Sequence, residues 1–156
     1  MTQEELFFAN ETRKHQQLVA KYLMQIAREL MKRAAVHDVS KMEAPEREAF
    51  IEATPKLRAL TYGSSEYNTA LAEMQGALRH HYDVNSHHPE HYTGGIVGMS
   101  LIDIVEMLMD WLAATERHDD GDIMKSIELN QARFEIEPQL KSILCNTIIR
   151  LGGADS

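Results

Sequence analysis

The sequence His37-Asp38-Val39-Ser40-Lys41 places an imidazole beside a carboxylate, between two segments that have helical periodicity. An adjacent His-Asp pair offers a neutral nitrogen and an anionic oxygen to one divalent cation, and first-row metals bind both kinds of donor. Two ligands do not complete a coordination shell. If the pair binds a metal, other segments of the fold must bring further ligands to it.

The segment before this pair has the period of one long helix. From Gln3 to about Ala35 apolar residues recur at steps of three and four. The pattern does not decide whether the helix breaks near Asn10. We expect His15 to point inward, toward a metal site, because it shares one stripe of this helix with Val19, Tyr22 and Ile26. The alternative is a core histidine whose nitrogens are satisfied by a backbone or hydroxyl partner.

Further helical patterns fill most of the remaining chain. They cover Pro45 to Ala53, closed by Thr54-Pro55, then Glu66 to His81, Leu101 to about Arg117 with Ser100 as N-cap, and two packing helices within about 122–151. No stretch of alternating apolar and polar residues is long enough to build a sheet. The predicted class is all-α, a compact bundle of about five to seven helices in a single domain over residues 1–156.

Five of the eight histidines lie between His80 and His91. The first two stand at the end of a helical pattern, and the stretch from Tyr82 to Gly95 has no consistent period. Loops that carry function are held in place by the rigid elements around them, and so many imidazoles indicate more than a connection. A solvated or helix-capping role for about half of these histidines is the alternative.

Three acids, Asp103, Glu106 and Asp110, follow at steps of three and four in a largely apolar helix, and therefore share one face. Like charges at this spacing repel one another unless water or a cation lies between them. The face is either solvated or functional, and we expect one of its acids to complete the metal shell.

Composition excludes several classes of protein. A net charge of -8 opposes association with nucleic-acid phosphates that is driven by charge. The single cysteine, Cys145, excludes an internal disulfide, and no apolar run approaches the roughly 20 residues of a membrane span. We expect a cytoplasmic protein without membrane contact, and self-association into a homo-oligomer is left open.

The order His15, then His37-Asp38, then Asp110 resembles the HD-domain superfamily of metal-dependent phosphohydrolases. Lys41 adds to the likeness, because many members carry His-Asp-x-x-Lys. The chain is also similar to an uncharacterised, largely phage-encoded group with His-Asp-x-Ser-Lys and His-His-Pro-Glu runs. The resemblance implies an HD-like helical domain with His15, His37, Asp38 and Asp110 as metal ligands, and Asp103 as the alternative for the last.

The additional histidines are similar to those by which some HD branches hold a second metal. The resemblance makes His81, and His87 or His88, candidate ligands of a second ion. It leaves the identity of the divalent metal open among Mn, Co, Zn, Fe, Mg and Ni, and the number open between one and two.

The function that the resemblance implies is hydrolysis of a phosphate ester or anhydride in a small nucleotide, by water that the metal activates. Asp38 would hold the catalytic metal, Lys41 would contact the phosphate, and His81 or a neighbouring loop histidine would protonate the leaving oxygen. Further candidates for substrate contact are Arg79, Asn85 and His88.

One departure from the family bears on the substrate. In the HD branch that removes phosphate from deoxynucleoside monophosphates, a carboxylate stands where this chain has Lys41. The acid that handles protons would then be Glu43, Glu46 or Glu106. The monophosphatase assignment is correspondingly weaker than the broader assignment to a phosphohydrolase.

Two other functions remain open from the sequence. A di-iron oxygenase of the same fold would use the extra histidines to hold two irons. A helical binding protein without enzymatic activity would use the metal structurally and contact a partner through its histidine-rich loop. The three hypotheses differ in whether the metal keeps an open coordination position.

Overall fold

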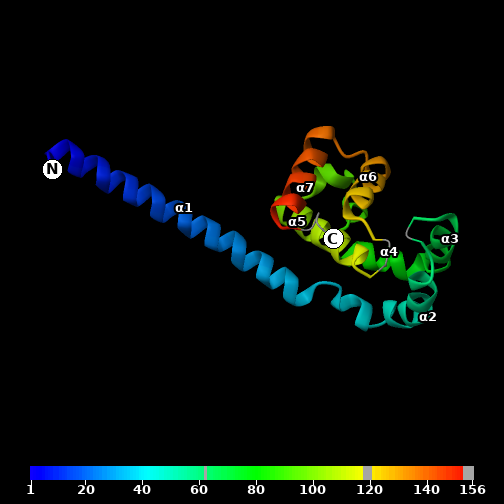
Figure 1. The fold of residues 1–156 in the computed structure, drawn as a ribbon. Coiled ribbons are helices and arrows are strands. Elements are labelled where there is room, and N and C mark those ends of the chain that lie inside the picture. Colours follow the sequence, from blue (N-terminus) through cyan, green and yellow to red (C-terminus); the bar gives the residue numbers. More distant parts are fainter. Residues whose placement is uncertain (62, 118–120, 153–156) are drawn as a thin grey trace. The chain divides into compact units, whose positions relative to one another are not determined.

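The structure, a computed structural model, describes residues 1–61, 63–117 and 121–152. Within these ranges all regular secondary structure is helical, with seven α-helices and no strand, which confirms the all-α class. The chain divides into two compact units, Met1–Val36 and His37–Ser156, and each is described by itself (Figure 1). The single domain over residues 1–156 therefore stays a prediction.

The first unit is one helix, α1 (Gln3–Val36). It begins with reciprocal hydrogen bonds in which the Thr2 amide donates to Glu5 Oε2 (2.6 Å) and the Glu5 amide donates to Thr2 Oγ1 (3.2 Å). The helix continues through Asn10 without the interruption that the sequence left open. None of its residues is buried, and the His15 side chain is exposed, so the inward face predicted for His15 has no core within this unit.

Six α-helices and three short 3-10 helices make up the described residues of the second unit. The α-helices are α2 (Glu46–Arg58), α3 (Ser65–Glu73), α4 (Gln75–Val84), α5 (Leu101–Thr115), α6 (Ile123–Phe134) and α7 (Pro138–Arg150). The 3-10 helices are η1 (Val39–Met42), η2 (Pro89–His91) and η3 (Gly95–Gly98). No helix in the described part of the chain combines the length and the apolarity that a membrane crossing requires.

Two boundaries differ from the prediction. Thr54-Pro55 does not end α2, which runs on to Arg58. Pro55 lies in the last turn, where a missing amide removes only one hydrogen bond, and Thr54 Oγ1 donates to the Phe50 carbonyl (2.6 Å). The single helix expected from Glu66 to His81 is broken at Met74. This residue is both the C-cap of α3 and the N-cap of α4.

The main core of the second unit lies between α5, α6 and α7. Ile127 and Ile148 are completely buried there, and the Trp111 ring stacks on Phe134 with 6.3 Å between centroids. The other core residues are Met107, Leu108, Ile123, Ile136 and Leu144. This core fixes one face of α5, and the acidic face of the same helix is left for other contacts.

A buried carboxylate, Asp103, fastens the segment between α4 and α5 to the start of α5. Asp103 is 3 % exposed and accepts hydrogen bonds from Ser86 Oγ (2.9 Å), the Tyr92 hydroxyl (2.9 Å), and the amide and hydroxyl of Ser100 (2.9 and 2.6 Å). The predicted cap Ser100 is therefore confirmed as half of a capping box. Gly98 is required nearby, because a Cβ there would lie 2.7 Å from Tyr92 Cβ.

Replacing Asp103 by Ala is expected to lower the free energy of unfolding by roughly 2–3 kcal/mol, since several buried donors lose a charged acceptor. Urea unfolding followed by circular dichroism measures this change. Glu116→Ala, at the exposed end of the same helix, is the matched control. Equal stability of the two variants would contradict the role given to Asp103.

Candidate metal centre

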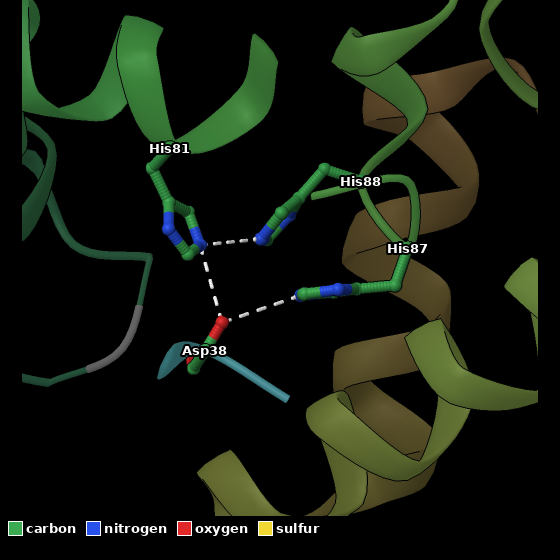
Figure 2. A group of neighbouring side chains, drawn as sticks. All are labelled: Asp38, His81, His87 and His88. Carbon is green, nitrogen blue, oxygen red and sulfur yellow. Dashed lines mark hydrogen bonds and ion pairs between the residues drawn. The ribbon is translucent and has the colours of Figure 1, made fainter. Parts of the chain in front are cut away.

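Four side chains of the second unit turn their polar atoms toward one point (Figure 2). Asp38, His81, His87 and His88 each offer one ligand atom, and these atoms all lie within 4.8 Å of one another. His81 Nε2 is 2.9 Å from His88 Nε2 and 3.3 Å from Asp38 Oδ1, and His87 Nε2 is 3.6 Å from the same oxygen. Three imidazoles and one carboxylate are a donor set that first-row divalent metals bind.

A second group adjoins the first. His37, His87 and Asp110 also offer ligand atoms within 4.8 Å of one another. His37 Nε2 lies 3.5 Å from Asp110 Oδ1 and 3.6 Å from Asp38 Oδ2. His87 belongs to both groups, and the two candidate cation positions are therefore neighbours.

The backbone at Asp38 directs the carboxylate into this cluster. Asp38 is left-handed, with φ 57° and ψ 15°, a conformation that Asp adopts more readily than most residues. The Asp38 carbonyl accepts a hydrogen bond from the Lys41 amide (3.0 Å), which closes the turn into η1. Lys41 Nζ then lies 2.5 Å from Asp38 Oδ2, and Oδ1 faces the histidines.

Two further carboxylates lie behind the histidines. Glu46 Oε2 accepts a hydrogen bond from His81 Nδ1 (2.8 Å), and Glu106 Oε1 accepts one from His37 Nδ1 (3.0 Å). Glu106 Oε1 is also 3.4 Å from His87 Nδ1. A carboxylate on Nδ1 fixes the ring and leaves Nε2 for a metal, which is the usual arrangement around histidine ligands.

Two buried atoms of the cluster have no hydrogen-bond partner among the described residues. They are Asp38 Oδ1 and His87 Nε2, and both point into the first group. A buried polar atom without a partner is costly, so native structures rarely keep one without a reason. The residues therefore fit a divalent cation, which would satisfy both atoms at once.

Burial keeps three of the imidazoles neutral. Desolvation lowers the pKa of His81, and the positive charge of Lys41 lowers it further. Desolvation also lowers the pKa of His87, and together with the neighbouring His87 and His81 it lowers the pKa of His88 to about 3. Neutral imidazoles are the form that binds metal, so this part of the cluster needs no deprotonation near pH 7.

His37 and Asp110 behave differently because they pair with each other. The hydrogen bond with Asp110 raises the pKa of His37 to about 9, against the opposing effect of burial, and Glu106 adds to the rise. Burial by itself raises the pKa of Asp110, but the hydrogen bond with His37 and the charge of Lys41 hold it at about 2. In the metal-free protein this pair is an imidazolium and a carboxylate.

Comparison with known proteins assigns the chain to a family. A family model described as "Family of unknown function (DUF5662)" matches residues 4–150, nearly the whole chain. The chain belongs to this family. Comparison with curated proteins gave no match, and comparison with solved structures gave none either.

The structure of this DUF5662 member brings together most of the candidate metal ligands that the sequence predicted. His37 Nε2 lies within 3.6 Å of both Asp38 and Asp110, although these two acids stand in different groups. The predicted second-site histidines join Asp38 in the first group: His81, His87 and His88. His15 lies in the first unit, so its part in the metal site stays a prediction. The sequence assigned Asp38 to the first metal and the loop histidines to a second, whereas the structure groups Asp38 with His81, His87 and His88.

Other predicted residues have different partners. Asp103, the alternative to Asp110, has a carboxylate that accepts hydrogen bonds from Ser86, Tyr92 and Ser100, and it stands in neither metal group among the described residues. Asn85 fastens the loop, because its Nδ2 donates to Ser40 Oγ and to the His81 carbonyl, both at 2.8 Å. Its contact with substrate stays a prediction. Arg79 has an exposed side chain on α4.

Among the acids proposed to handle protons, Glu43 is exposed after η1, whereas Glu46 and Glu106 hold histidines. Burial alone raises the pKa of Glu46, but hydrogen bonds from His80, Ser40 and His81 keep it below its ordinary value. The sequence missed that these glutamates support histidines. The one sequence signal for this role of Glu106 was the spacing of the acids Asp103, Glu106 and Asp110, which placed Glu106 on the same helix face as Asp110.

The pKa of His37 predicts how the stability of the metal-free protein changes with pH. Because folding raises this pKa from 6.5 to about 9, its contribution is complete below pH 6.5 and is lost as the pH rises through 9. In excess chelator the thermal midpoint should therefore fall between pH 6.5 and 9. Thermal unfolding by circular dichroism measures it.

His37→Gln should flatten this pH dependence. The other shifted groups of the cluster titrate below this range, since the pKa values of His88 and Asp110 lie at about 3 and about 2. A wild-type midpoint that rises from pH 6.5 to 9 would contradict the pairing of His37 with Asp110.

Proposed function

We propose that the protein is a metal-dependent phosphohydrolase that acts on a small nucleotide or a related phosphate ester. The proposal rests on the convergence of three histidine nitrogens and Asp38 Oδ1, because two of these atoms are buried without a hydrogen-bond partner among the described residues. The likeness of His37-Asp38, Lys41 and Asp110 to the HD-domain superfamily supports the reaction class. The fold class agrees with it, because the site is carried by helices and short turns alone.

The cluster has a closed side and a more open side. His81, His87 and Glu46 are almost inaccessible, whereas the side chains of His37, Lys41 and Asp110 are 29 %, 30 % and 24 % exposed. A catalytic metal needs a position that water or substrate can reach, and a structural metal does not. The partly exposed edge beside His37 and Asp110 is the side from which water or substrate would reach a cation, which supports a catalytic centre.

A bound divalent cation would lower the pKa of water and polarise a phosphoryl oxygen. Its ligands would be Asp38, His81, His87 and His88, with His37 and Asp110 available at the neighbouring position. Lys41 neutralises one oxygen of Asp38 and lies at the open edge, where its charge would attract a phosphate. Glu46 and Glu106 hold the imidazoles still, which limits the reorganisation that the reaction requires.

Asp38→Asn is expected to abolish phosphate release. It removes an anionic ligand, and we expect a loss greater than the roughly 10- to 100-fold that follows removal of a residue that only supports a ligand. The measurement is a screen of nucleotides and simple phosphate esters with purified, metal-loaded protein. Asp83→Asn, an exposed acid on α4, is the control and should retain activity.

Chelation provides the complementary test of the reaction. Excess chelator should remove the activity, and added divalent metal should restore it. Phosphate release that persists in chelator, or an Asp38→Asn variant as active as Asp83→Asn, would rule out the proposed mechanism.

The second candidate is a di-iron oxygenase. It is favoured by the share of imidazole in the cluster, since His37, His81, His87 and His88 provide nitrogen ligands that suit iron as well as zinc. Elemental analysis of the purified protein together with oxygen uptake distinguishes the two functions. Bound iron with oxygen consumption and no phosphate release would select the oxygenase.

A structural metal in a binding protein is the third hypothesis. In that case Asp38→Asn should lower the thermal midpoint of the metal-loaded protein strongly, because the free energy of metal binding is then part of the folding free energy. In a catalytic site, turnover falls with a much smaller change in stability.

A further inference from the structure

Glu46 is a charged residue in an unexpected place. It lies in the first turn of α2 and is 0 % exposed, as deeply buried as the apolar core residue Ile148. An ionised carboxylate is costly to bury unless its oxygens are well hydrogen-bonded. Both oxygens of Glu46 are used: Oε1 accepts from His80 Nδ1 (2.7 Å), and Oε2 accepts from His81 Nδ1 (2.8 Å) and Ser40 Oγ (2.9 Å).

We propose that Glu46 is a positioning residue of the metal centre: it keeps the proton of His81 on Nδ1 and so presents the unprotonated Nε2 to the cation. The inference uses the metal centre of the proposed function and does not depend on which reaction that centre performs.

The tautomer of His81 follows from the chemistry of its partner. A neutral imidazole carries one proton, on Nδ1 or on Nε2, and an ionised carboxylate can only accept a hydrogen bond. The 2.8 Å contact with Glu46 therefore assigns the proton to Nδ1. The lone pair is then on Nε2, the atom that lies 2.9 Å from His88 Nε2 and 3.3 Å from Asp38 Oδ1.

The opposite tautomer would close the site to a cation. With its proton on Nε2, His81 would donate to Asp38 Oδ1 and satisfy that oxygen. The cluster would then lose the His81 nitrogen as a ligand, and Asp38 Oδ1 would accept a hydrogen bond in place of binding the cation. Without Glu46 that tautomer is available, so the buried carboxylate determines whether the four side chains act as ligands or as a hydrogen-bonded core.

Ser40 and Asn85 connect Glu46 to the two segments that carry the other ligands. Asn85 Nδ2 donates to Ser40 Oγ (2.8 Å), and the Ser40 hydroxyl donates to Glu46 Oε2. Ser40 comes from the segment of Asp38, and Asn85 from the loop of His87 and His88. Ser40, the serine of His-Asp-x-Ser-Lys, therefore helps to fix the Glu46 carboxylate that contacts His81.

His80 shares the carboxylate but not the metal site. Its side chain is 40 % exposed, and it belongs to neither metal group. The two histidines follow each other on α4, so their side chains diverge by about 100° around the helix. Removing His80 should therefore affect the cation far less than removing the carboxylate.

The experiment compares Glu46→Gln with Glu48→Gln, an exposed glutamate on the same helix whose side chain is 71 % exposed. A glutamine keeps the size of Glu46, but its NH₂ group cannot accept a hydrogen bond, so one imidazole contact is lost or reversed. Zinc affinity is measured by competition with a chromophoric chelator at fixed pH, and the ligand set is followed through the visible spectrum of bound cobalt(II).

We expect Glu46→Gln to bind zinc about 10- to 100-fold more weakly than wild type and to change the cobalt spectrum. Glu48→Gln should match wild type, and His80→Ala should lie much closer to wild type than Glu46→Gln. If Glu46→Gln binds zinc as tightly as wild type and loses only thermal stability, Glu46 serves the fold alone and the proposal is overturned.

A measurement on the wild type avoids dependence on the folding of the variant. Long-range ¹H–¹⁵N correlation spectra of the metal-free protein report which nitrogen of His81 carries the proton. Protonated Nδ1 supports the proposal, and protonated Nε2 overturns it. A wild type that binds no divalent metal overturns both this proposal and the proposed function, whereas tight metal binding without phosphate release contradicts only the proposed function.

Discussion

The carboxylate of Asp103 fixes the distance between the histidines and the acids of the site. It holds the segment between α4 and α5 against the start of α5 through Ser86, Tyr92 and Ser100. His87 and His88 lie in that segment, and Glu106 and Asp110 follow one and two turns further along α5. One buried charge thus holds an irregular stretch of chain in register with a helix, although it takes no part in the metal groups itself.

Without a cation, the cluster lowers the stability of the folded state. Burial lowers the pKa values of His81, His87 and His88, and their rings lie close together. Two buried polar atoms also have no hydrogen-bond partner in the described part of the chain. Such local cost persists when the rest of the structure overdetermines the geometry, and it is common where a protein trades stability for function. The hydrogen bonds of Asp103, Glu46 and Glu106 are the contacts that hold this geometry in place.

The sequence predicted the helices better than the contacts between them. Periodicity and caps are local, so the long helix after Gln3, the Ser100 cap and the two C-terminal helices could be read directly. The break at Met74 could not, because Gly76, two residues further on, is a weak signal that a continuous helix also tolerates. Likewise, the spacing of Asp103, Glu106 and Asp110 put three acids on one face, but their separate partners depend on residues distant in the sequence.

His87 stands in both candidate cation positions, and this limits how they can be filled. Nε2 of an imidazole has one lone pair, and Nδ1 of His87 faces Glu106, so the ring can serve only one ion at a time through Nε2. Whichever position takes His87 gains a ligand at the other's expense. If the protein binds two cations, the second to bind therefore has one imidazole ligand fewer than the first.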